Sequence, residues 1–504
     1  MRTDPPPPTT GVPPGRVYNQ KLAVVVVYVA ALFMNIMDTT IVNVALPTLG
    51  RQFHVGPAAV DIVVIGYLVS LAVFIPASGW IGDRFGAKRV LLAAVGIFTV
   101  ASALCGAATN LDELVVFRVL QGVGGGMLIP VGMAMLYRTF PPSERVRVAG
   151  MLMLPTAVAP ALGPVLGGLL VTDLSWRWVF FVNLPVGVAA LVYGLICLQE
   201  RRDEDPGRFD LTGFALAAVG FASLMYGLSE GPSKGWMSSG ILAPITAGVV
   251  LIAALVGVER RTAEPIIDIG LFRDRMFGIA NLLVTLTMLA FFGVLYLVPL
   301  FYQDGRGLSA LGSGLGTFPE AIGVFVSAQV VSRYLYPVVG PRRLMAAGLA
   351  GVAVFTALMA LVGAHTSLWW MRALMFCLGY CIPNVMMSMQ TAAFATVASE
   401  ATGRASTLFN AQRQLGGALG VAVLSSVVAA VGPFAVRAGH RVPQLTAYHA
   451  AFLTASGVAL LAGAVALIYV HDADAAATMV RRGRPAPATA AVSAAGATPA
   501  GGTR

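Results

Sequence analysis

The sequence predicts an all-α, polytopic membrane protein, and three observations support this fold class. Of the 504 residues, 57% are hydrophobic and only 11% are charged, which is too apolar for a soluble globular protein. Apolar stretches of about 20 residues, enough to span a hydrocarbon core as a helix, recur along almost the whole chain. The basic residues are distributed asymmetrically among the loops between them. A single core of the soluble type is therefore excluded.

Fourteen apolar segments are long enough to form transmembrane helices. Their approximate bounds are 22–46, 58–78, 89–107, 112–135, 148–171, 178–198, 210–228, 240–258, 277–302, 313–334, 343–363, 367–394, 405–430 and 449–470. The residues before the first segment lack the basic-then-apolar order of a cleaved signal peptide, so we expect the first helix to remain as an anchor. The tail after His471 is rich in Ala, Pro, Thr and Gly, and we expect it to be disordered.

The Lys and Arg residues in the loops predict the orientation. With a cytoplasmic N-terminus, 25 of the 33 basic residues fall on the cytoplasmic side and 6 on the outer side. Basic residues concentrate in cytoplasmic loops, and an odd number of spans would misplace the later clusters. We therefore expect both termini on the cytoplasmic side of a cell inner membrane. This topology, rather than an anionic partner such as nucleic acid, explains the net charge of +10.

A weak internal repeat divides the chain into two halves. The segment GWIGDRFGAKR at 79–89 follows the second span, and the loop after the tenth span ends with GPRR at 340–343, which has the same Gly-x-basic-basic spacing. Such repeats are common in membrane transport proteins. We expect the following organisation: a disordered cytoplasmic N-terminus at 1–20, a six-helix bundle at 21–200, linkers with two extra transmembrane helices at 201–275, a second six-helix bundle at 276–470 and a disordered cytoplasmic tail at 471–504.

The segment 79–89 resembles the signature loop of the major facilitator superfamily. Its glycines permit a tight turn and close helix contact, and Asp83 can pair with Arg84 or with the positive end of a helix to close a cytoplasmic gate. The matching position in the second half is Pro337, so a gate there must work differently. The expected gate residues are Gly79, Asp83, Arg84, Gly86, Lys88 and Arg89.

Further motifs narrow the resemblance. RVLQGVGGG at 118–126 is similar to the superfamily's arginine-containing motif, and APALGPVLGG at 159–168 is similar to the motif associated with antiporters. DTTIVNVALP at 38–47 resembles the signature of the 14-helix drug:proton antiporters of the EmrB/QacA type. The same family is resembled by WRWVFFVNLP at 176–185, PLFYQ at 299–303 and NAQRQLGG at 410–417.

The resemblance implies the major facilitator fold, with two six-helix bundles and two additional helices between them. It also implies a Pro/Gly-rich helix that seals the transport cavity against proton leak, with Pro160, Gly163, Pro164, Gly167 and Gly168 as its residues here. One position departs from the family pattern. The Trp usually found five residues before Tyr67 is Ile62 in this chain, so a substrate preference based on aromatic stacking there does not carry over.

Few ionisable residues lie inside the predicted spans, and each is a functional candidate because an unpaired charge in the membrane is costly. Asp38, Arg118 and Glu320 fall roughly 5–8 Å to the outer side of their span centres at a rise of 1.5 Å per residue, so they can share one layer. We expect Asp38 to be the coupling acid and Arg118 to tune it, with Glu320 and Asp61 as further proton or cation sites. The alternatives are a structural Asp38 bonded to Arg118 or Asn43, a Glu320 that reaches polar groups near the outer end, and an Asp61 favoured by the helix dipole.

These residues and the resemblance predict a proton-coupled multidrug efflux antiporter that exports amphipathic, cationic compounds by alternating access. The alternatives are a narrow-specificity exporter of an endogenous metabolite, antibiotic, peptide or lipid, and a membrane sensor that does not transport. The sequence has no Gly-x-x-x-x-Gly-Lys-Ser/Thr phosphate loop, and its five histidines show no ligand spacing. We therefore expect no enzyme, no cofactor and no metal site. The expected partners are the small-molecule substrate, protons and the lipid bilayer, around a monomer.

Overall fold

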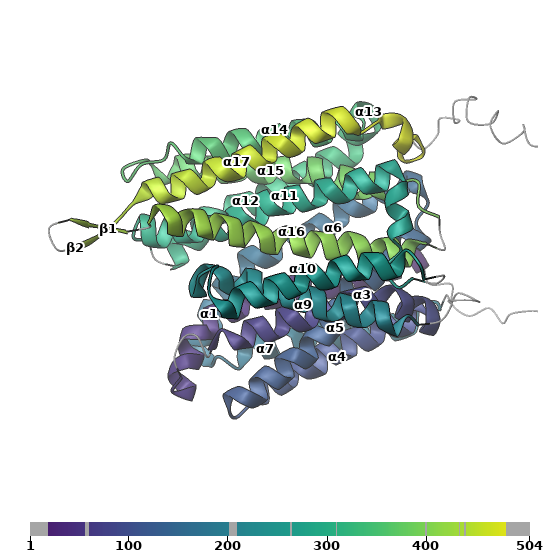
Figure 1. Ribbon diagram of the computed structural model, residues 1–504, viewed down its shortest axis with the longest axis horizontal. Coiled ribbons are helices and arrows are strands. Elements are labelled where there is room, and N and C mark those ends of the chain that lie inside the picture. Colours follow the sequence, from purple (N-terminus) through teal and green to yellow (C-terminus); the bar gives the residue numbers. More distant parts are fainter. Residues whose placement is uncertain are drawn as a thin grey trace, which may run out of the picture.

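The structure is a computed structural model that describes residues 19–55, 60–200, 209–262, 265–308, 310–398, 401–432, 434–437 and 440–479. The described residues contain fourteen helices that are long and apolar enough to cross a membrane, which confirms the predicted number. The first and last of these helices place both ends of the described chain at one end of the structure (Figure 1). We call this the terminal end. The opposite one is the hairpin end, after the short hairpin of β1 (Phe434–Arg437) and β2 (His440–Pro443) that lies there (Figure 1).

The N-terminal bundle contains six spans. They are α1 (Gln20–Phe53), α3 (Ile62–Phe85), α4 (Ala87–Ala107), α5 (Leu111–Thr139), α6 (Pro142–Leu169) with the π-helical turn η1 (Leu170–Leu174), and a divided sixth span, α7 (Trp178–Phe181) and α8 (Asn183–Cys197). Asparagine side chains cap two of the helices. Asn19 accepts a hydrogen bond from the backbone N–H of Leu22 in α1, and Asn110 accepts one from that of Glu113 in α5, which satisfies backbone donors that the first turn leaves free.

The first helix is longer than the hydrophobic segment that predicted it. It continues from position 46 through Pro47 to Phe53 and ends where His54 adopts a left-handed conformation, with φ of 55°. Hydropathy detects only the apolar part of a helix, so it does not detect a helix end that contains polar residues such as Arg51. As a result Asp38 lies near the middle of α1.

Two additional helices, α9 (Leu211–Lys234) and α10 (Ser239–Glu259), lie between the bundles (Figure 1). α9 packs against α3 on one side and against α16 of the C-terminal bundle on the other. The indole N–H of Trp236 donates to the hydroxyl of Ser426 over 2.8 Å and ties the pair to α16. Val249 and Val250 of α10 are exposed, as expected of a helix whose outer face meets lipid.

The C-terminal bundle also contains six spans. They are α11 (Arg275–Leu300) with the π-helical turn η3 (Phe301–Gly305), α12 (Ala310–Val330) with η4 (Val331–Leu335) and α13 (Tyr336–Val339), α14 (Pro341–Met359), α15 (Leu368–Ala393), α16 (Thr402–Val431) and α17 (Leu445–Tyr469). A short 3-10 helix, η2 (Ile269–Arg273), precedes them. Between α16 and α17, β1 (Phe434–Arg437) and β2 (His440–Pro443) pair antiparallel; no strand was predicted there, because four-residue strands carry little hydrophobic pattern.

The chain after α17 differs from the predicted disordered tail. Residues Asp472–Thr478 form a 3-10 helix, η5, at the terminal end. The hydroxyls of Thr478 and Tyr336 are 2.8 Å apart, and Asp472 accepts a hydrogen bond from the backbone N–H of Arg342 over 2.8 Å. These polar contacts order seven residues that have no hydrophobic periodicity. The predicted tail beyond residue 479 and the N-terminal residues 1–18 lie outside the described residues.

Candidate proton and substrate site

Asp38 in α1 and Arg118 in α5 form an ion pair inside the N-terminal bundle. Oδ2 of Asp38 lies 2.5 Å from Nη1 of Arg118, and the exposed fractions of the two residues are 0% and 1%. A buried charge is tolerated only when it is paired and hydrogen-bonded. The predicted contact between these residues is therefore present, and each side chain supplies the counter-charge of the other.

Three neutral side chains complete this network. Nε2 of Gln121, one turn after Arg118 on α5, donates to Oδ1 of Asp38 over 2.8 Å and to the hydroxyl of Ser102 in α4 over 2.7 Å. Its Oε1 accepts from Nη1 of Arg118 over 2.7 Å. Nδ2 of Asn183 in α8 donates to the same Oδ1 over 3.2 Å. The Asp38 carboxylate thus joins α1 to α5 and α8, and Gln121 extends the network to α4.

The guanidinium of Arg118 is also enclosed by aromatic rings. It lies 4.2 Å from the ring centroid of Tyr67 and 5.8 Å from that of Phe180, which is cation–π geometry. Its Nε donates to the backbone carbonyl of Val63 over 3.2 Å. The Tyr67 hydroxyl accepts from Nδ2 of Asn35 over 2.9 Å. Arg118 is therefore held from α1 and α3 as well as from its own helix.

The glycines of the arginine-containing motif let α5 approach its neighbours closely. A Cβ on Gly122 would lie 2.6 Å from the carbonyl oxygen of Tyr67, and one on Gly124 would lie 2.7 Å from that of Ala94. A side chain at either position would push α3 or α4 away. The motif thus positions Arg118 by permitting backbone contact around it. Asn43, the other partner considered for Asp38, is exposed and has no part in the network.

The network can respond to a proton. With Asp38 ionised, the pair carries no net charge. Protonation of Asp38 would leave the buried Arg118 guanidinium without a counter-charge, which costs several kcal/mol unless the structure rearranges. The arrangement can therefore link the protonation state of one carboxylate to the relative positions of the four helices that the network joins.

Glu320 does not join this network. It lies near the middle of α12, is half-buried, and its carboxylate has no ion pair or hydrogen bond among the described residues. α12 packs against α6 and α15, and a Cβ on Gly379 would collide with the backbone of Glu320. Glu320 is thus an isolated acid where α12 and α15 cross.

Asp61 lies outside the network as well. It is exposed at the N-cap of α3, just outside the membrane span, and its side chain makes no capping hydrogen bond. Partial burial raises the pKa of the Asp61 carboxyl, and the nearby carboxylate of Glu230 in α9 raises it further, whereas Lys234 lowers it. Asp61 therefore faces the additional helices rather than Asp38.

The acid of the signature loop forms a contact between the two bundles. Oδ1 of Asp83 lies 2.8 Å from Nη2 of Arg138 in α5, and a Cβ on Gly403 would lie 2.9 Å from Oδ2 of Asp83. The carboxylate thus sits at the first turn of α16, where the helix dipole favours a negative charge. Of the two predicted partners of Asp83, the positive end of a helix is therefore present, whereas Arg84 is exposed. A Cβ on Gly79 would lie 3.1 Å from the Gly403 carbonyl oxygen, so glycines allow this close packing.

The other end of the loop has a different role. Glu200, after α8, accepts hydrogen bonds from the backbone N–H groups of Lys88 and Arg89 over 3.2 and 3.3 Å. The carboxylate lies against Gly86, which has φ of 93°. Lys88 and Arg89 therefore help to anchor α4 to the end of α8, and they do not reach the contact made by Asp83.

The second half repeats this anchor with a residue that was not predicted. Gly340 has φ of 82°, and a Cβ there would lie 2.7 Å from the carboxylate of Asp472. The backbone N–H of Arg342 donates to that carboxylate over 2.8 Å. Asp472 thus caps α14 as Glu200 caps α4. The repeat predicted from Gly-x-basic-basic spacing includes an acid that follows the last helix of each half.

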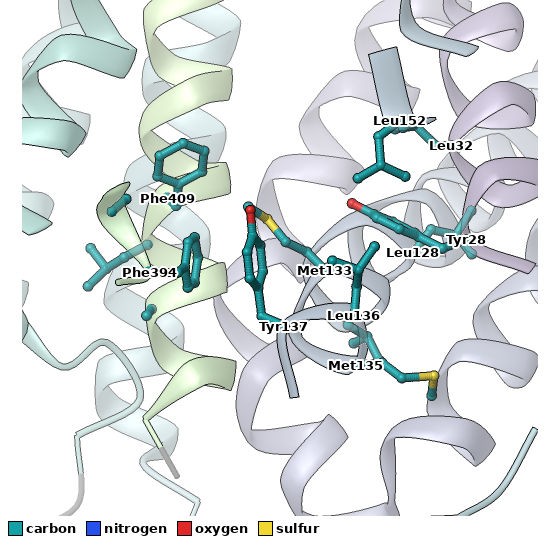
Figure 2. Packing of buried hydrophobic residues seen from close by; sticks show 14 of the residues in the cluster. Tyr28, Leu32, Leu128, Met133, Met135, Leu136, Tyr137, Leu152, Phe394 and Phe409 are labelled. Carbon is teal, nitrogen blue, oxygen red and sulfur yellow. The ribbon is translucent and has the colours of Figure 1, made fainter. Parts of the chain in front are cut away.

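More contacts join the bundles at the terminal end. The hydroxyls of Ser78 in α3 and Thr407 in α16 are 3.3 Å apart. Nη1 of Arg145 donates to the carbonyl of Phe394 over 2.5 Å. The rings of Tyr137 and Phe394 stack with centroids 4.4 Å apart and planes 7° apart, as Figure 2 shows. The structure is therefore closed between the bundles at this end.

The helix that carries the antiporter-like motif packs on the helix that carries Asp38. A Cβ on Gly163 would collide with Thr40, and one on Gly167 would lie 3.1 Å from Ile41. Nothing lies within contact distance of a Cβ on Gly168. Pro160 is half-buried, and the side chain of Pro164 lies outside the described part. Gly163 and Gly167 thus join α6 to α1 within a turn of Asp38.

Comparison with known proteins places this arrangement in a family. The sequence matches the profile of the Major Facilitator Superfamily over residues 28–421. The chain belongs to this superfamily. It is 35% identical over 405 residues to the multidrug resistance protein B homolog of Mycobacterium tuberculosis, covering 79% of this chain and 74% of that protein. It is 31% identical over 461 residues to the putative multidrug resistance protein MdtD of Klebsiella pneumoniae, covering 89% and 95%.

A solved structure agrees with this major facilitator fold. The human organic anion transporter MFSD10 (TETRAN) superposes with a TM-score of 0.65 over 88% of this chain and 99% of that one, at 16% identity, which shows the fold alone. The multidrug resistance relatives are consistent with the drug:proton antiporter family that the motifs resembled. The chain is thus a multi-pass membrane transporter, and the prediction that it is not an enzyme is confirmed.

Proposed function

We propose that this transporter is a proton-coupled antiporter that exports amphipathic cationic compounds across the cytoplasmic membrane by alternating access. Both termini lie in the cytoplasm in this proposal, as the distribution of basic residues predicts. The closed terminal end is then the cytoplasmic end. Its relatives named as multidrug resistance proteins support export as the direction of transport.

The single observation that carries the proposal is the fully buried pair of Asp38 and Arg118. Because protonation of Asp38 removes the counter-charge of Arg118, proton binding and a rearrangement of α1 against α5 are energetically linked. A localised cationic group on the cargo, unlike the delocalised ring charge of ethidium, needs a different carboxylate, since Asp38 is enclosed by its own partners. Glu320, which has no partner among the described residues, is available to a cationic group that enters between α12 and its neighbours.

The test is proton-driven uptake of ethidium into proteoliposomes that hold the purified transporter. A pH difference across the membrane should drive ethidium uptake by the wild type, and Asp38→Asn should abolish it while the protein remains folded. Asp112→Asn removes an exposed acid from the first turn of α5 and serves as the matched control. Proton-driven uptake that persists in Asp38→Asn would refute the coupling role. A folded wild-type protein that shows no uptake would favour a sensor.

A further inference from the structure

Arg413 lies well inside α16, one of the helices that are long and apolar enough to cross a membrane. It lies eleven residues after Thr402, the first residue of α16, which is roughly 16 Å along the helix. The residue is only partly accessible. Hydropathy does not mark this residue, because one basic residue barely changes the mean hydropathy of the span predicted at 405–430.

The guanidinium of Arg413 has no counter-ion among the described residues. It makes no ion pair or hydrogen bond there, and the group that interacts with it electrostatically is the hydroxyl of Tyr28 in α1. A neutral phenol does not compensate a full charge. Intramembrane charges are normally paired or face a hydrated interior. The unpaired guanidinium of Arg413 therefore suits a ligand that supplies the missing negative charge.

The intramembrane carboxylates described above do not supply the missing charge. Asp38 is held in its buried network, and Asp83 lies in the contact at the terminal end. Glu320 lies in α12 and makes no ion pair with Arg413. Arg413 and Glu320 thus both lack a counter-ion among the described residues, and they do not neutralise each other.

Several N–H and O–H groups on the helices around Arg413 have weak hydrogen-bond partners or none among the described residues. Tyr28 is 2% exposed, and its hydroxyl has no hydrogen-bond partner in the described part of the chain, although buried tyrosines usually have one. Figure 2 shows this hydroxyl on the side of the ring that faces α16. Nδ2 of Asn410, nearly one turn before Arg413, donates to the Ser406 carbonyl over 2.9 Å and to the sulfur of Met133 over 3.2 Å. Nε2 of Gln390 in α15 donates to the same sulfur over 3.7 Å. A thioether is a weak acceptor.

We propose that Arg413, the Tyr28 hydroxyl and the Asn410 amide bind the carboxylate of a zwitterionic substrate. A guanidinium binds a carboxylate through two parallel hydrogen bonds, and the phenol and the amide donate to the same oxygens. The cationic group of the substrate is compensated by Glu320. This inference rests on the proposed transport function only in naming the ligand as cargo, because binding to the subsite is measured without transport.

The test uses two fluorescent dyes that differ only in the anionic group. Rhodamine 110 has a free carboxylate, and rhodamine 123 is its methyl ester. Binding of each dye to the purified full-length transporter in detergent is followed by fluorescence anisotropy. We expect Arg413→Gln to weaken rhodamine 110 binding by about 10- to 100-fold, the range for a charge-assisted hydrogen-bonded contact, and to change rhodamine 123 binding by less than about threefold. Arg413→Lys keeps the positive charge but lacks the two parallel donors of the guanidinium. Its rhodamine 110 binding should be weaker than that of the wild type and stronger than that of Arg413→Gln.

Two further variants keep the test decisive. Tyr28→Phe removes only a hydroxyl and should weaken rhodamine 110 binding selectively by about 2- to 10-fold, even if Arg413→Gln fails to fold. Arg372→Gln is the matched control, because Arg372 lies 4.6 Å from the Trp369 ring near the start of α15. Equal losses for both dyes, no loss in either variant, or no binding of rhodamine 110 by the wild type would each overturn the carboxylate subsite. Failure of proton-driven ethidium uptake would refute the antiport proposal and leave this binding result standing.

Discussion

The carboxylate of Asp38 in α1 lies 2.5 Å from the guanidinium of Arg118 in α5, and both side chains are buried within the N-terminal bundle. Gln121 and Asn183 donate to the same carboxylate, so all its strong contacts come from inside the bundle. The stability of the bundle and the charge on Asp38 therefore depend on each other. This dependence can be measured apart from transport.

The first prediction concerns the pair as a unit. Asp38→Asn and Arg118→Gln should each lower the free energy of unfolding by about 3–5 kcal/mol, because each leaves a buried charge without its partner. The double variant removes both charges and should recover most of that loss. Thermal unfolding of the purified proteins in detergent measures all three. If the single effects add in the double variant, the two charges are not coupled.

The double variant also separates stability from coupling. A purely structural Asp38 predicts that transport returns together with stability when both charges are removed. A coupling Asp38 predicts a stable double variant without proton-driven ethidium uptake. Uptake by the double variant at more than about a tenth of the wild-type rate would favour the structural role.

The second prediction concerns closure at the terminal end. Arg138→Gln removes the ion pair of Asp83 at the first turn of α16, and loss of about 1–2 kcal/mol from the closed state should open this end more often. A cysteine at Ser78, which is buried beside Thr407, should react with a maleimide about 5- to 30-fold faster in a background without the four native cysteines. Arg84→Gln, at an exposed neighbouring position, is the control. Equal rates in the two variants would show that the ion pair does not hold the gate.

Much of the fold could be predicted because hydropathy and loop charge depend on residues close together in the chain. The fourteen spans follow from local composition. The contact between Asp38 and Arg118 could be anticipated because two opposite charges in the same apolar layer must find partners. Glu320 does not join the network of Asp38, since a depth estimated along one helix does not say which bundle interior the side chain faces.

The contacts of the remaining site residues could not be inferred from one sequence. Gln121 and Asn183 belong to recognised sequence motifs. A neutral amide in an apolar span nevertheless has no required partner until the helices pack, so their hydrogen bonds to Asp38 could not be inferred. The partner of Asp83 is Arg138, 55 positions away, whereas the adjacent Arg84 offered the simpler local pair. Asp472 lies in a stretch without hydrophobic periodicity, where its only signal is the preceding repeat.

The third prediction concerns this C-terminal anchor. Asp472→Ala should lower the free energy of unfolding by about 1–2 kcal/mol, because it removes the acceptor for the backbone N–H of Arg342 at the start of α14. Asp474→Ala is a matched control, since Asp474 is exposed on the same short helix. Thermal unfolding compares the two variants. An equal change in the free energy of unfolding for both variants would mean that the Asp472 contact after α17 does not stabilise the second bundle.

The fourth prediction concerns Glu320 and the number of charges on the cargo. Propidium and ethidium share a phenanthridinium core, but propidium carries a second permanent positive charge. Because Glu320 is half-buried and has no partner among the described residues, it can compensate that second charge away from bulk water, where an unpaired cation costs several kcal/mol. Glu320→Gln should therefore reduce propidium uptake by about tenfold or more and ethidium uptake by less than about threefold.

Glu320→Asp keeps the charge and should retain most propidium uptake. An equal fall for both dyes in Glu320→Gln would argue against a cation site at this residue, since losing only a packing contact gives no reason to distinguish one positive charge from two.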